Sequence, residues 1–509
     1  MNENRTKKSI KNIITGVGYK SIGIFFPFII RTVMIKKLGA EYLGLNSLFT
    51  SILQMLSLSE LGIGNAMVYS MYKPIAAGDT KRVCALLALY QKCYRYIGII
   101  IMLLGLLLLP FLDLLIDGAY PTEINLYILY LIYLFNTVIS YFLFAYKKSI
   151  LDATQNISIE NVIQTFFMAI MYSIQIIILW FIKNYYVYII LLPITTILIN
   201  LFRFRIITKK YPQYKCYGII DKEFIDDLKS KIKALIGHKI GNSIIWFSDS
   251  IIISAFLGLN ILAIYSNYYY VMNAVIGMLA IFYNSILASV GNSIVMENSE
   301  KNYKDFINLN FINIWLVSFC TICLLCLYQP FMELWMGKKM MFDFSVVILF
   351  SFYFYTWMFN KIANMYLNAA GLWKYAFWKP YVSSCVNLIL NIILVNIVGI
   401  IGVLISTIVA SIFIETLWES SVIHKYLFKE KSKLYYLQLF KGIIFTGIGG
   451  LITYLICSFI SYKILFLTLL LRTIICIIIP NILYIFIFRK TEELMFYIYK
   501  IKKILNIIR

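Results

Sequence analysis

Long apolar segments alternate with short polar ones along nearly the whole chain. An apolar helix of about 20 residues crosses the hydrocarbon core of a membrane, and on this basis we place about fourteen spans. No polar block is longer than about thirty residues, which is less than a globular domain needs. The pattern therefore predicts an all-α integral membrane protein. The expected spans are 13–35, 45–71, 96–110, 123–146, 157–182, 187–207, 236–256, 262–295, 307–330, 345–370, 377–398, 401–424, 442–461 and 464–488.

An internal repeat divides these spans. Residues 18–45 have a weaker copy at 237–264, offset by 219, in which Lys20 corresponds to Lys239 and Gly39 to Gly258. Two further matches keep nearly the same offset: residues 110–114 recur at 330–334, and residues 151–155 recur at 367–371. Each copy holds six spans, an even number, so both copies have the same orientation in the membrane. Such parallel repeats are related by an axis along the membrane normal, and they are typical of transporters.

The repeat and the polar breaks together define the expected domain organisation. Two six-helix lobes are joined by a polar cytoplasmic linker that ends in an amphipathic helix. Two additional spans follow, and then a basic amphipathic tail that we expect on the inner leaflet. The boundaries are 1–207 for the N-terminal lobe, 208–235 for the linker, 236–424 for the C-terminal lobe, 425–488 for the additional spans and 489–509 for the tail.

Composition supports a membrane location and explains the high net charge. The chain is 61% hydrophobic and 14% charged, with a mean hydropathy of +0.81. The formal net charge is +22. With both termini in the cytoplasm, roughly 38 of the 46 Lys and Arg fall on the cytoplasmic side, as the positive-inside rule requires. The charge therefore reflects topology, and we expect no nucleic-acid partner.

Motifs for enzymatic or metal chemistry are missing from the sequence. It has no Walker-type phosphate loop and no GxSxG, so we expect neither an ATP-driven pump nor an enzyme. The spacing of Cys320, Cys323 and Cys326 is the CxxCxxC of an iron–sulfur cluster motif. These cysteines lie in an apolar helix, however, without a loop that supplies a fourth ligand. We interpret them as small packing residues, and expect no metal site and no cofactor.

Basic residues inside the apolar helices are the candidates for substrate binding, because a charge at membrane depth is costly and marks a functional site by default. We expect Lys20 and Lys239, at matching positions of the repeat, to face each other across a central cavity. Arg31 lies eleven residues after Lys20, about three helical turns, and so on the same stripe. The alternative is that Lys20 and Arg31 extend to opposite interfaces. Lys361, with asparagines nearby, is a fourth candidate.

Two acidic residues are the candidates for ion coupling or gating. Glu60 is followed closely by two glycines, which favour a loosened helix where a carboxylate and a freed carbonyl group can meet a cation or a proton. Asp249 lies within the seventh expected span. For both residues the alternative is a structural pair with a basic residue on a neighbouring helix.

Three stretches carry a family resemblance: LGAEYLGLNSLF at 38–49, LSLSELGIGNAMVYSMYKPIAAGD at 56–79 and LGLNILAIYSNYYYVMNAVIGMLAIFYNSILASVGN at 257–292. Over essentially its whole length the chain resembles the Wzx-like polysaccharide flippases (O-antigen and teichuronic-acid type) of the multidrug/oligosaccharidyl-lipid/polysaccharide exporter superfamily. The resemblance implies export of undecaprenyl-diphosphate-linked oligosaccharide from the inner to the outer leaflet by alternating access. It also implies the bacterial cytoplasmic membrane as location, a cationic cavity for the headgroup, and a polysaccharide polymerase as a partner.

Three other functions remain open at this point. A multidrug or cation antiporter of the same superfamily would favour a predominantly acidic cavity, whereas the residues here are mixed to basic. A peptidoglycan-precursor flippase differs mainly in its cargo. A membrane glycan polymerase or ligase would be an enzyme with a sizeable outer loop, and the expected outer connections are short.

Overall fold

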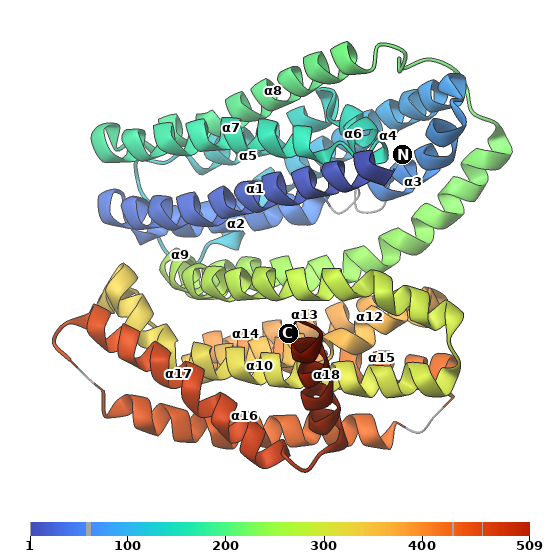
Figure 1. Cartoon of the computed structure of the whole chain (residues 1–509). Helices are drawn as coiled ribbons and strands as arrows, with labels where there is room; N and C mark the ends of the chain where they lie inside the picture. Colours follow the sequence, from blue (N-terminus) through green and yellow to red (C-terminus); the bar gives the residue numbers. More distant parts are fainter. Residues whose placement is uncertain (1, 58–62, 430–431, 461, 509) are drawn as a thin grey trace. The chain divides into compact units, whose positions relative to one another are not determined.

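The computed structural model describes residues 2–57, 63–429, 432–460 and 462–508, and within these ranges every regular element is a helix (Figure 1). Contacts between residues group the chain into two units, Met1–Ala263 and Ile264–Arg509. The division lies inside one long helix, α9 (Lys222–Met296), rather than at residue 236, where the sequence places the start of the second lobe. We describe each unit by itself.

The first unit is a bundle of helices in which α1 and α7 run parallel, with Asn12 beside Ser158 and Phe26 beside Tyr172. Its α1 packs along α7, and α5 packs against both α4 and α8. The loop before α5 joins this bundle to α9, since the Asp117 amide donates to the Ser254 carbonyl over 2.8 Å. The helices before α9 are α1 (Asn2–Lys37), α2 (Ala40–Leu56), α3 (Ile63–Ala77), α4 (Thr80–Leu108), α5 (Leu126–Phe142), α6 (Lys148–Ala153), α7 (Ile157–Ile177) and α8 (Tyr185–Lys210).

The second unit is built around α10, which packs against α11, α16 and α17 (Figure 1). A buried aromatic cluster that includes Phe311, Phe445 and Tyr484 holds the last two long helices on α10. The helices are α10 (Ser299–Met336), α11 (Phe344–Met358), α12 (Lys361–Ala369), α13 (Lys379–Val398), α14 (Ile400–Val409), η8 (Ala410–Thr416), α15 (Leu417–Ile423), α16 (Lys433–Ser458), α17 (Leu465–Phe488) and α18 (Glu492–Ile508).

The repeat read from the sequence is visible in the backbone. Gly39 ends the turn after α1 with φ 124°, and its partner Gly258 breaks α9 with φ 82°. At an offset of 216, Gln155 and Gly371 both have positive φ after α6 and α12, and so do Lys183 and Gly399 after the fifth and eleventh expected spans. The chain therefore turns in the same way at equivalent places in both halves.

The helical, membrane-embedded fold class is as expected, and the exact number of spans stays a prediction. Eleven helices are long and apolar enough to cross a membrane, or twelve if α5 and α6, which are bent by 51°, form one span. The second expected span, 45–71, falls on α2 and α3 and on residues 58–62, which lie outside the described part of the chain. The seventh and eighth expected spans fall within α9, on either side of its non-helical break at Gly258.

The polar linker and the tail differ in detail from the expectation. Helix α8 continues to Lys210, and the amphipathic part of the linker merges into α9 instead of forming a separate helix. In the tail, Leu494 and Tyr497 of α18 pack against the aromatic cluster of the second unit. Part of the apolar face of α18 is therefore used for packing within the protein.

We expect Gly258→Ala to lower the thermal stability of the protein more than Gly39→Ala. Both glycines have backbone angles that other residues rarely adopt, which costs of order 1–3 kcal/mol for a side chain. At Gly258 a Cβ would also lie 2.9 Å from the Asp117 carbonyl oxygen, whereas nothing lies within 4 Å at Gly39. Thermal unfolding in detergent measures the difference. The control is Gly277→Ala, inside α9 with open space around it; equal losses at all three positions would contradict the argument.

Candidate functional site

The two basic candidates on α1 have different surroundings. Lys20 is exposed, and Arg31 is half-buried, near Tyr188 of α8. Helix α1 runs without interruption through Pro27. These placements leave the roles of Lys20 and Arg31 as predictions.

The other candidates from the sequence are described to different extents. Lys239 lies in α9, but its side chain is outside the described part of the structure, as is the whole of Glu60. Asp249 is in α9 and only 1% exposed, so its carboxylate is enclosed by protein. Lys361 begins α12, and of the six candidates it alone belongs to a polar cluster whose members the structure defines.

That cluster lies where an apolar helix is interrupted, and the interruption occurs in both halves of the chain. In the first half α5 ends at Phe142 before α6; in the second, α11 ends at Met358 before α12, again at an offset of 216. Interrupted apolar segments in corresponding positions of two repeats are typical of the binding region of transporters. The charged residues around these breaks are therefore candidates for a binding site.

In the first half the break is adjacent to buried charges. Lys147 is 6% exposed; its ammonium donates to Thr208 Oγ1 over 2.8 Å and lies 4.1 Å from the centre of the Phe204 ring. Nearby on α7 and α8, Glu160 and Arg203 form a bidentate ion pair with N–O distances of 2.5 and 2.8 Å. Both side chains are buried, and a buried, bidentate pair of this kind holds two helices in one register.

In the second half a corresponding pair joins α13 to α15. The Lys379 ammonium donates to Glu419 Oε1 over 2.6 Å, and both residues are at most 2% exposed. Two amides complete the shell of the carboxylate: Asn364 donates to Oε1 over 2.6 Å and Asn360 to Oε2 over 2.5 Å. Tyr435 of α16 donates in turn to Asn360. The carboxylate thus links four helices.

The two ion pairs occupy related positions with opposite polarity. Lys379 follows Glu160 by 219 residues and Glu419 follows Arg203 by 216, the offsets that relate the two halves. The acid lies on α7 in the first half, but on α15, in the last span of the repeat, in the second. Each half therefore joins the same pair of spans by one ion pair, with the charges exchanged.

The cluster of the second half contains two further charges. Lys361 and Glu415 each lie close enough to Lys379 and Glu419 for their charges to interact. Glu415 accepts a hydrogen bond from Ser383 Oγ over 3.3 Å. We call Lys361, Lys379, Glu415 and Glu419 the C-terminal charge cluster.

Only Lys361 of these charged residues was selected from the sequence. Lys147, Glu160, Arg203, Lys379, Glu415 and Glu419 were missed. All but Glu415 lie near the ends of helices or expected spans, where charges usually reach water, whereas Glu415 lies inside the expected span 401–424. These residues could have been found by comparing the two halves of the repeat for positions that are charged in both, whatever the sign of the charge.

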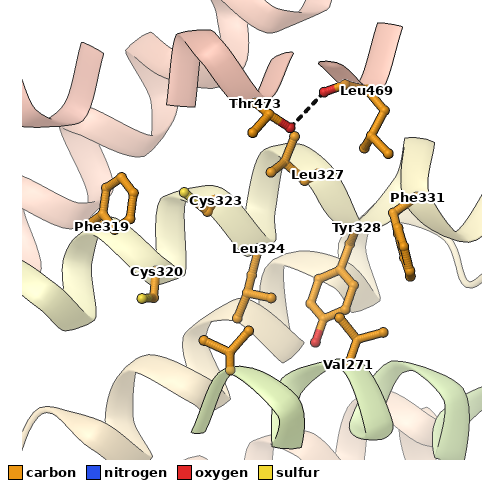
Figure 2. A pocket seen from close by; sticks show the side chains of 11 residues that line it. Val271, Phe319, Cys320, Cys323, Leu324, Leu327, Tyr328, Phe331, Leu469 and Thr473 are labelled. Atoms are coloured by element: carbon orange, nitrogen blue, oxygen red, sulfur yellow. Dashed lines mark hydrogen bonds between the residues drawn. The ribbon is translucent and has the colours of Figure 1, made fainter. Parts of the chain in front are cut away.

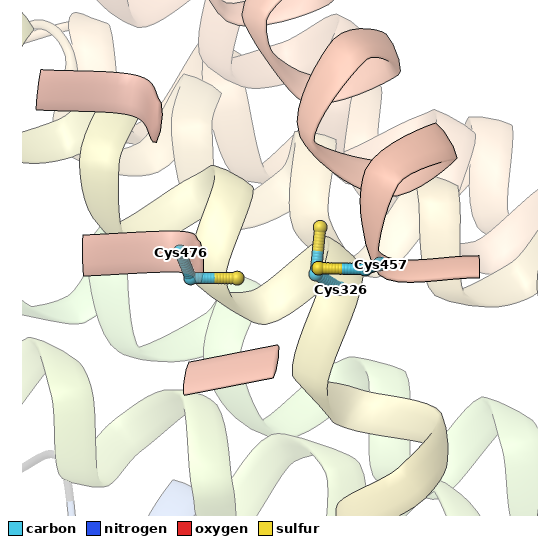
Figure 3. Close-up of side chains that lie close together, drawn as sticks. All are labelled: Cys326, Cys457 and Cys476. Atoms are coloured by element: carbon cyan, nitrogen blue, oxygen red, sulfur yellow. The ribbon is translucent and has the colours of Figure 1, made fainter. Parts of the chain in front are cut away.

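The three cysteines of residues 320–326 have different surroundings. Cys320 and Cys323 line an apolar pocket, whereas Cys326 meets Cys457 of α16 and Cys476 of α17 (Figure 3). These three sulfur atoms are buried and lie within 4.8 Å of one another. Three thiols are one ligand fewer than the four that structural zinc sites require. The packing interpretation stays our prediction for them.

The apolar pocket lies between α9, α10 and α17 and has a volume of about 330 Å³ (Figure 2). Its hydroxyl groups are already used: Thr473 donates to the Leu469 carbonyl and Tyr328 to the Tyr268 carbonyl. A second pocket of about 320 Å³, between α10, α11 and α16, contains Ser351, Thr446 and Tyr355. The first pocket is therefore the one better suited to hydrocarbon.

We expect Arg203→Met to lower the free energy of unfolding by about 3–5 kcal/mol, because it leaves the Glu160 carboxylate buried without its partner. The double substitution Glu160→Lys with Arg203→Glu gives the first half the polarity of the second, and should recover most of this loss in thermal unfolding. The control is Asp152→Asn, which removes an exposed pair with Lys148 and should cost less than about 0.5 kcal/mol. A double variant no more stable than Arg203→Met would show that the side chains do not act as a pair.

The sequence and the fold were compared with those of known proteins. No protein-family model matches the sequence, and neither does any curated protein. Among solved structures, a lipid II flippase MurJ in an inward closed conformation matches with a TM-score of 0.65 and 17% identity, over 94% of this chain and 99% of that one.

Two MATE transporters match as well. An inward-facing MATE family transporter of the MOP superfamily matches with a TM-score of 0.60 and 14% identity, over 80% of this chain and 98% of that one. A variant of the Vibrio cholerae MATE transporter VcmN matches with a TM-score of 0.54 and 16% identity, over 85% of this chain and 99% of that one. The chain therefore has the fold of the transporters and flippases of the MOP superfamily.

Proposed function

We propose that the protein is a flippase that moves undecaprenyl-diphosphate-linked oligosaccharide, the repeat unit of a polysaccharide, from the inner to the outer leaflet of the bacterial cytoplasmic membrane. The observation that carries this proposal is the match in fold to a lipid II flippase over 94% of the chain. The three stretches that resemble Wzx-like flippases favour an oligosaccharide cargo. Both termini are cytoplasmic in this proposal, and a polysaccharide polymerase is the partner that would use the product.

The charges suit an anionic headgroup. A diphosphate that leaves water needs charge-assisted hydrogen bonds, which are stronger than neutral ones. In the proposed cycle Lys20, Arg31, Lys239 and Lys361 supply them, while Glu60 and Asp249 serve in ion coupling or gating. Moving negative charge outward is favoured by about 2.3 kcal/mol per charge at 100 mV, so the membrane potential assists export.

The lipid part of the substrate has a matching surface in the second unit. The pocket between α9, α10 and α17 is lined by hydrocarbon and by hydroxyl groups that are already hydrogen-bonded (Figure 2). We propose that it holds part of the polyprenyl chain while the headgroup crosses.

We expect translocation of an undecaprenyl-diphosphate oligosaccharide in proteoliposomes, measured by its accessibility to an outside sugar-modifying enzyme. Lys20→Ala with Lys239→Ala should abolish it, because the headgroup loses two positive partners at membrane depth. The control double substitution is Lys338→Ala with Lys339→Ala, in the connection after α10. Wild-type transport in a folded Lys20/Lys239 variant would contradict the headgroup role.

The cargo used in the same assay separates the three superfamily functions. Movement of lipid II but not of the lipid-linked oligosaccharide would make the protein a peptidoglycan-precursor flippase. Export of organic cations against a sodium or proton gradient, without lipid movement, would make it an antiporter.

We expect Leu327→Trp to slow translocation severalfold, because the larger ring fills the pocket of about 330 Å³ proposed for the polyprenyl chain. The matched control is Leu325→Trp, two residues away on α10, which fills the second pocket instead. Equal transport by the two folded variants would contradict a role of the first pocket.

A further inference from the structure

The C-terminal charge cluster holds one acid that the repeat does not explain. At the offset of 216 that relates Arg203 to Glu419, the residue in the first half that corresponds to Glu415 is Ile199, which is buried. Glu415 therefore has no counterpart in the ion pair of the first half. A carboxylate held at membrane depth without that structural explanation is a candidate for function.

Glu419 is unsuited to switching because its carboxylate is fully engaged. Both oxygen atoms accept hydrogen bonds, from Lys379, Asn364 and Asn360, at distances of 2.5 to 2.6 Å. Removing its charge would leave the Lys379 ammonium buried without a partner, which is strongly unfavourable. Glu419 is thus held in place by three hydrogen bonds, one of them from the Lys379 ammonium.

Glu415 and Lys361 are held much more loosely. The only hydrogen bond of the Glu415 carboxylate among the described residues is the one from Ser383 Oγ, at 3.3 Å. Within the same part of the chain, Lys361 makes no hydrogen bond and no ion pair within 4 Å, although both carboxylates act on its charge. Glu415 also lies in the π-helical turn η8, a geometry that occurs frequently at functional sites.

We propose that Lys361 binds the diphosphate of the substrate and that Glu415 competes for the same ammonium group, so that the substrate binds together with one proton. The identity of the anion rests on the function proposed above. When Glu415 is ionised, its negative charge acts on Lys361 from a distance and opposes a second anion there. When Glu415 is protonated, the ammonium is free to bind the diphosphate.

The direction of the pH dependence follows from linkage. Protonation of Glu415 favours the bound anion, and the bound anion favours protonation by the same factor. Affinity for a diphosphate should therefore rise as pH falls through the range in which Glu415 titrates, by at most about tenfold per pH unit for one proton.

Helices α11, α13, α14 and α15 pack against the turn that holds Glu415, and the charged groups that they bring to it are Lys379 from α13 and Glu419 from α15. Tyr435 of α16 lies one contact further away, beyond Asn360. Lys379 and Glu419 are bound to each other, and Tyr435 donates to Asn360. His424, one turn beyond Ser420, is hydrogen-bonded to the Ser420 carbonyl and its ring packs on Phe306. Glu415 is therefore the acid with the fewest fixed contacts in the cluster.

The test measures binding of UDP-N-acetylglucosamine to the purified full-length protein by calorimetry, from mildly acidic to mildly alkaline pH. This probe is a soluble diphosphate diester whose own charge stays constant over that range, so a change in affinity reports the protein. For the wild type we expect affinity to rise as pH falls. Glu415→Gln should bind at every pH at least as tightly as the wild type does in acid, and Lys361→Gln should lose about tenfold or more throughout.

Two further variants test whether the pH dependence comes from Glu415 itself. Ser383→Ala removes the hydroxyl that donates to the Glu415 carboxylate, and should move the change in affinity to higher pH without removing either charge. Glu333→Gln, at an exposed pair with Lys338, should leave the profile unchanged. Full pH dependence in folded Glu415→Gln, or an unshifted profile in Ser383→Ala, would overturn the proposal.

Failure of this inference can be told from failure of the proposed function. If lipid-linked oligosaccharide is translocated in proteoliposomes while Lys361→Gln binds the probe as the wild type does, the flippase function stands and the role of Lys361 falls. If the probe binds with the expected pH dependence but no lipid moves, the anion site stands and the cargo is wrong.

Discussion

A charge at membrane depth has to be neutralised by a partner, and this constraint shapes both halves of the protein. In each half one buried ion pair joins two neighbouring spans near a break in a third. A single unpaired partner would be costly, so each pair holds its helices in a fixed register. Each half thereby contains a rigid group of helices, as a transporter that rearranges by rocking requires.

The fold could be predicted largely from the pattern of apolar segments, because spanning helices must satisfy their backbone groups internally. The repeat was found through Gly39 and Gly258, whose backbone angles only glycine adopts readily, so that residue type records geometry there. The number of membrane spans was harder to predict. The long α9 runs through the polar linker without a break, and helical propensity within that linker does not show where the membrane begins.

The candidate site was less predictable for a physical reason. An ion pair works equally well with its charges exchanged, so Glu160 and Arg203 could diverge from Lys379 and Glu419 without loss of the contact. A comparison of residue identities between the halves cannot detect such a pair. Lys361 was identified because it lies well inside the expected span 345–370, whereas Lys379 lies at the start of the expected span 377–398, where a lysine usually reaches the interface.

The difference between the halves is as informative as their likeness. The first half neutralises its buried acid completely, since Arg203 binds both oxygen atoms of Glu160. The second half neutralises Glu419 in the same way and then adds Glu415 and Lys361, which are not needed for the contact between spans. Additional charge at membrane depth lowers stability unless it is compensated. The contact between spans accounts for the shared ion pair but not for the additional acid and base, to which we therefore assign the proposed proton-linked anion site.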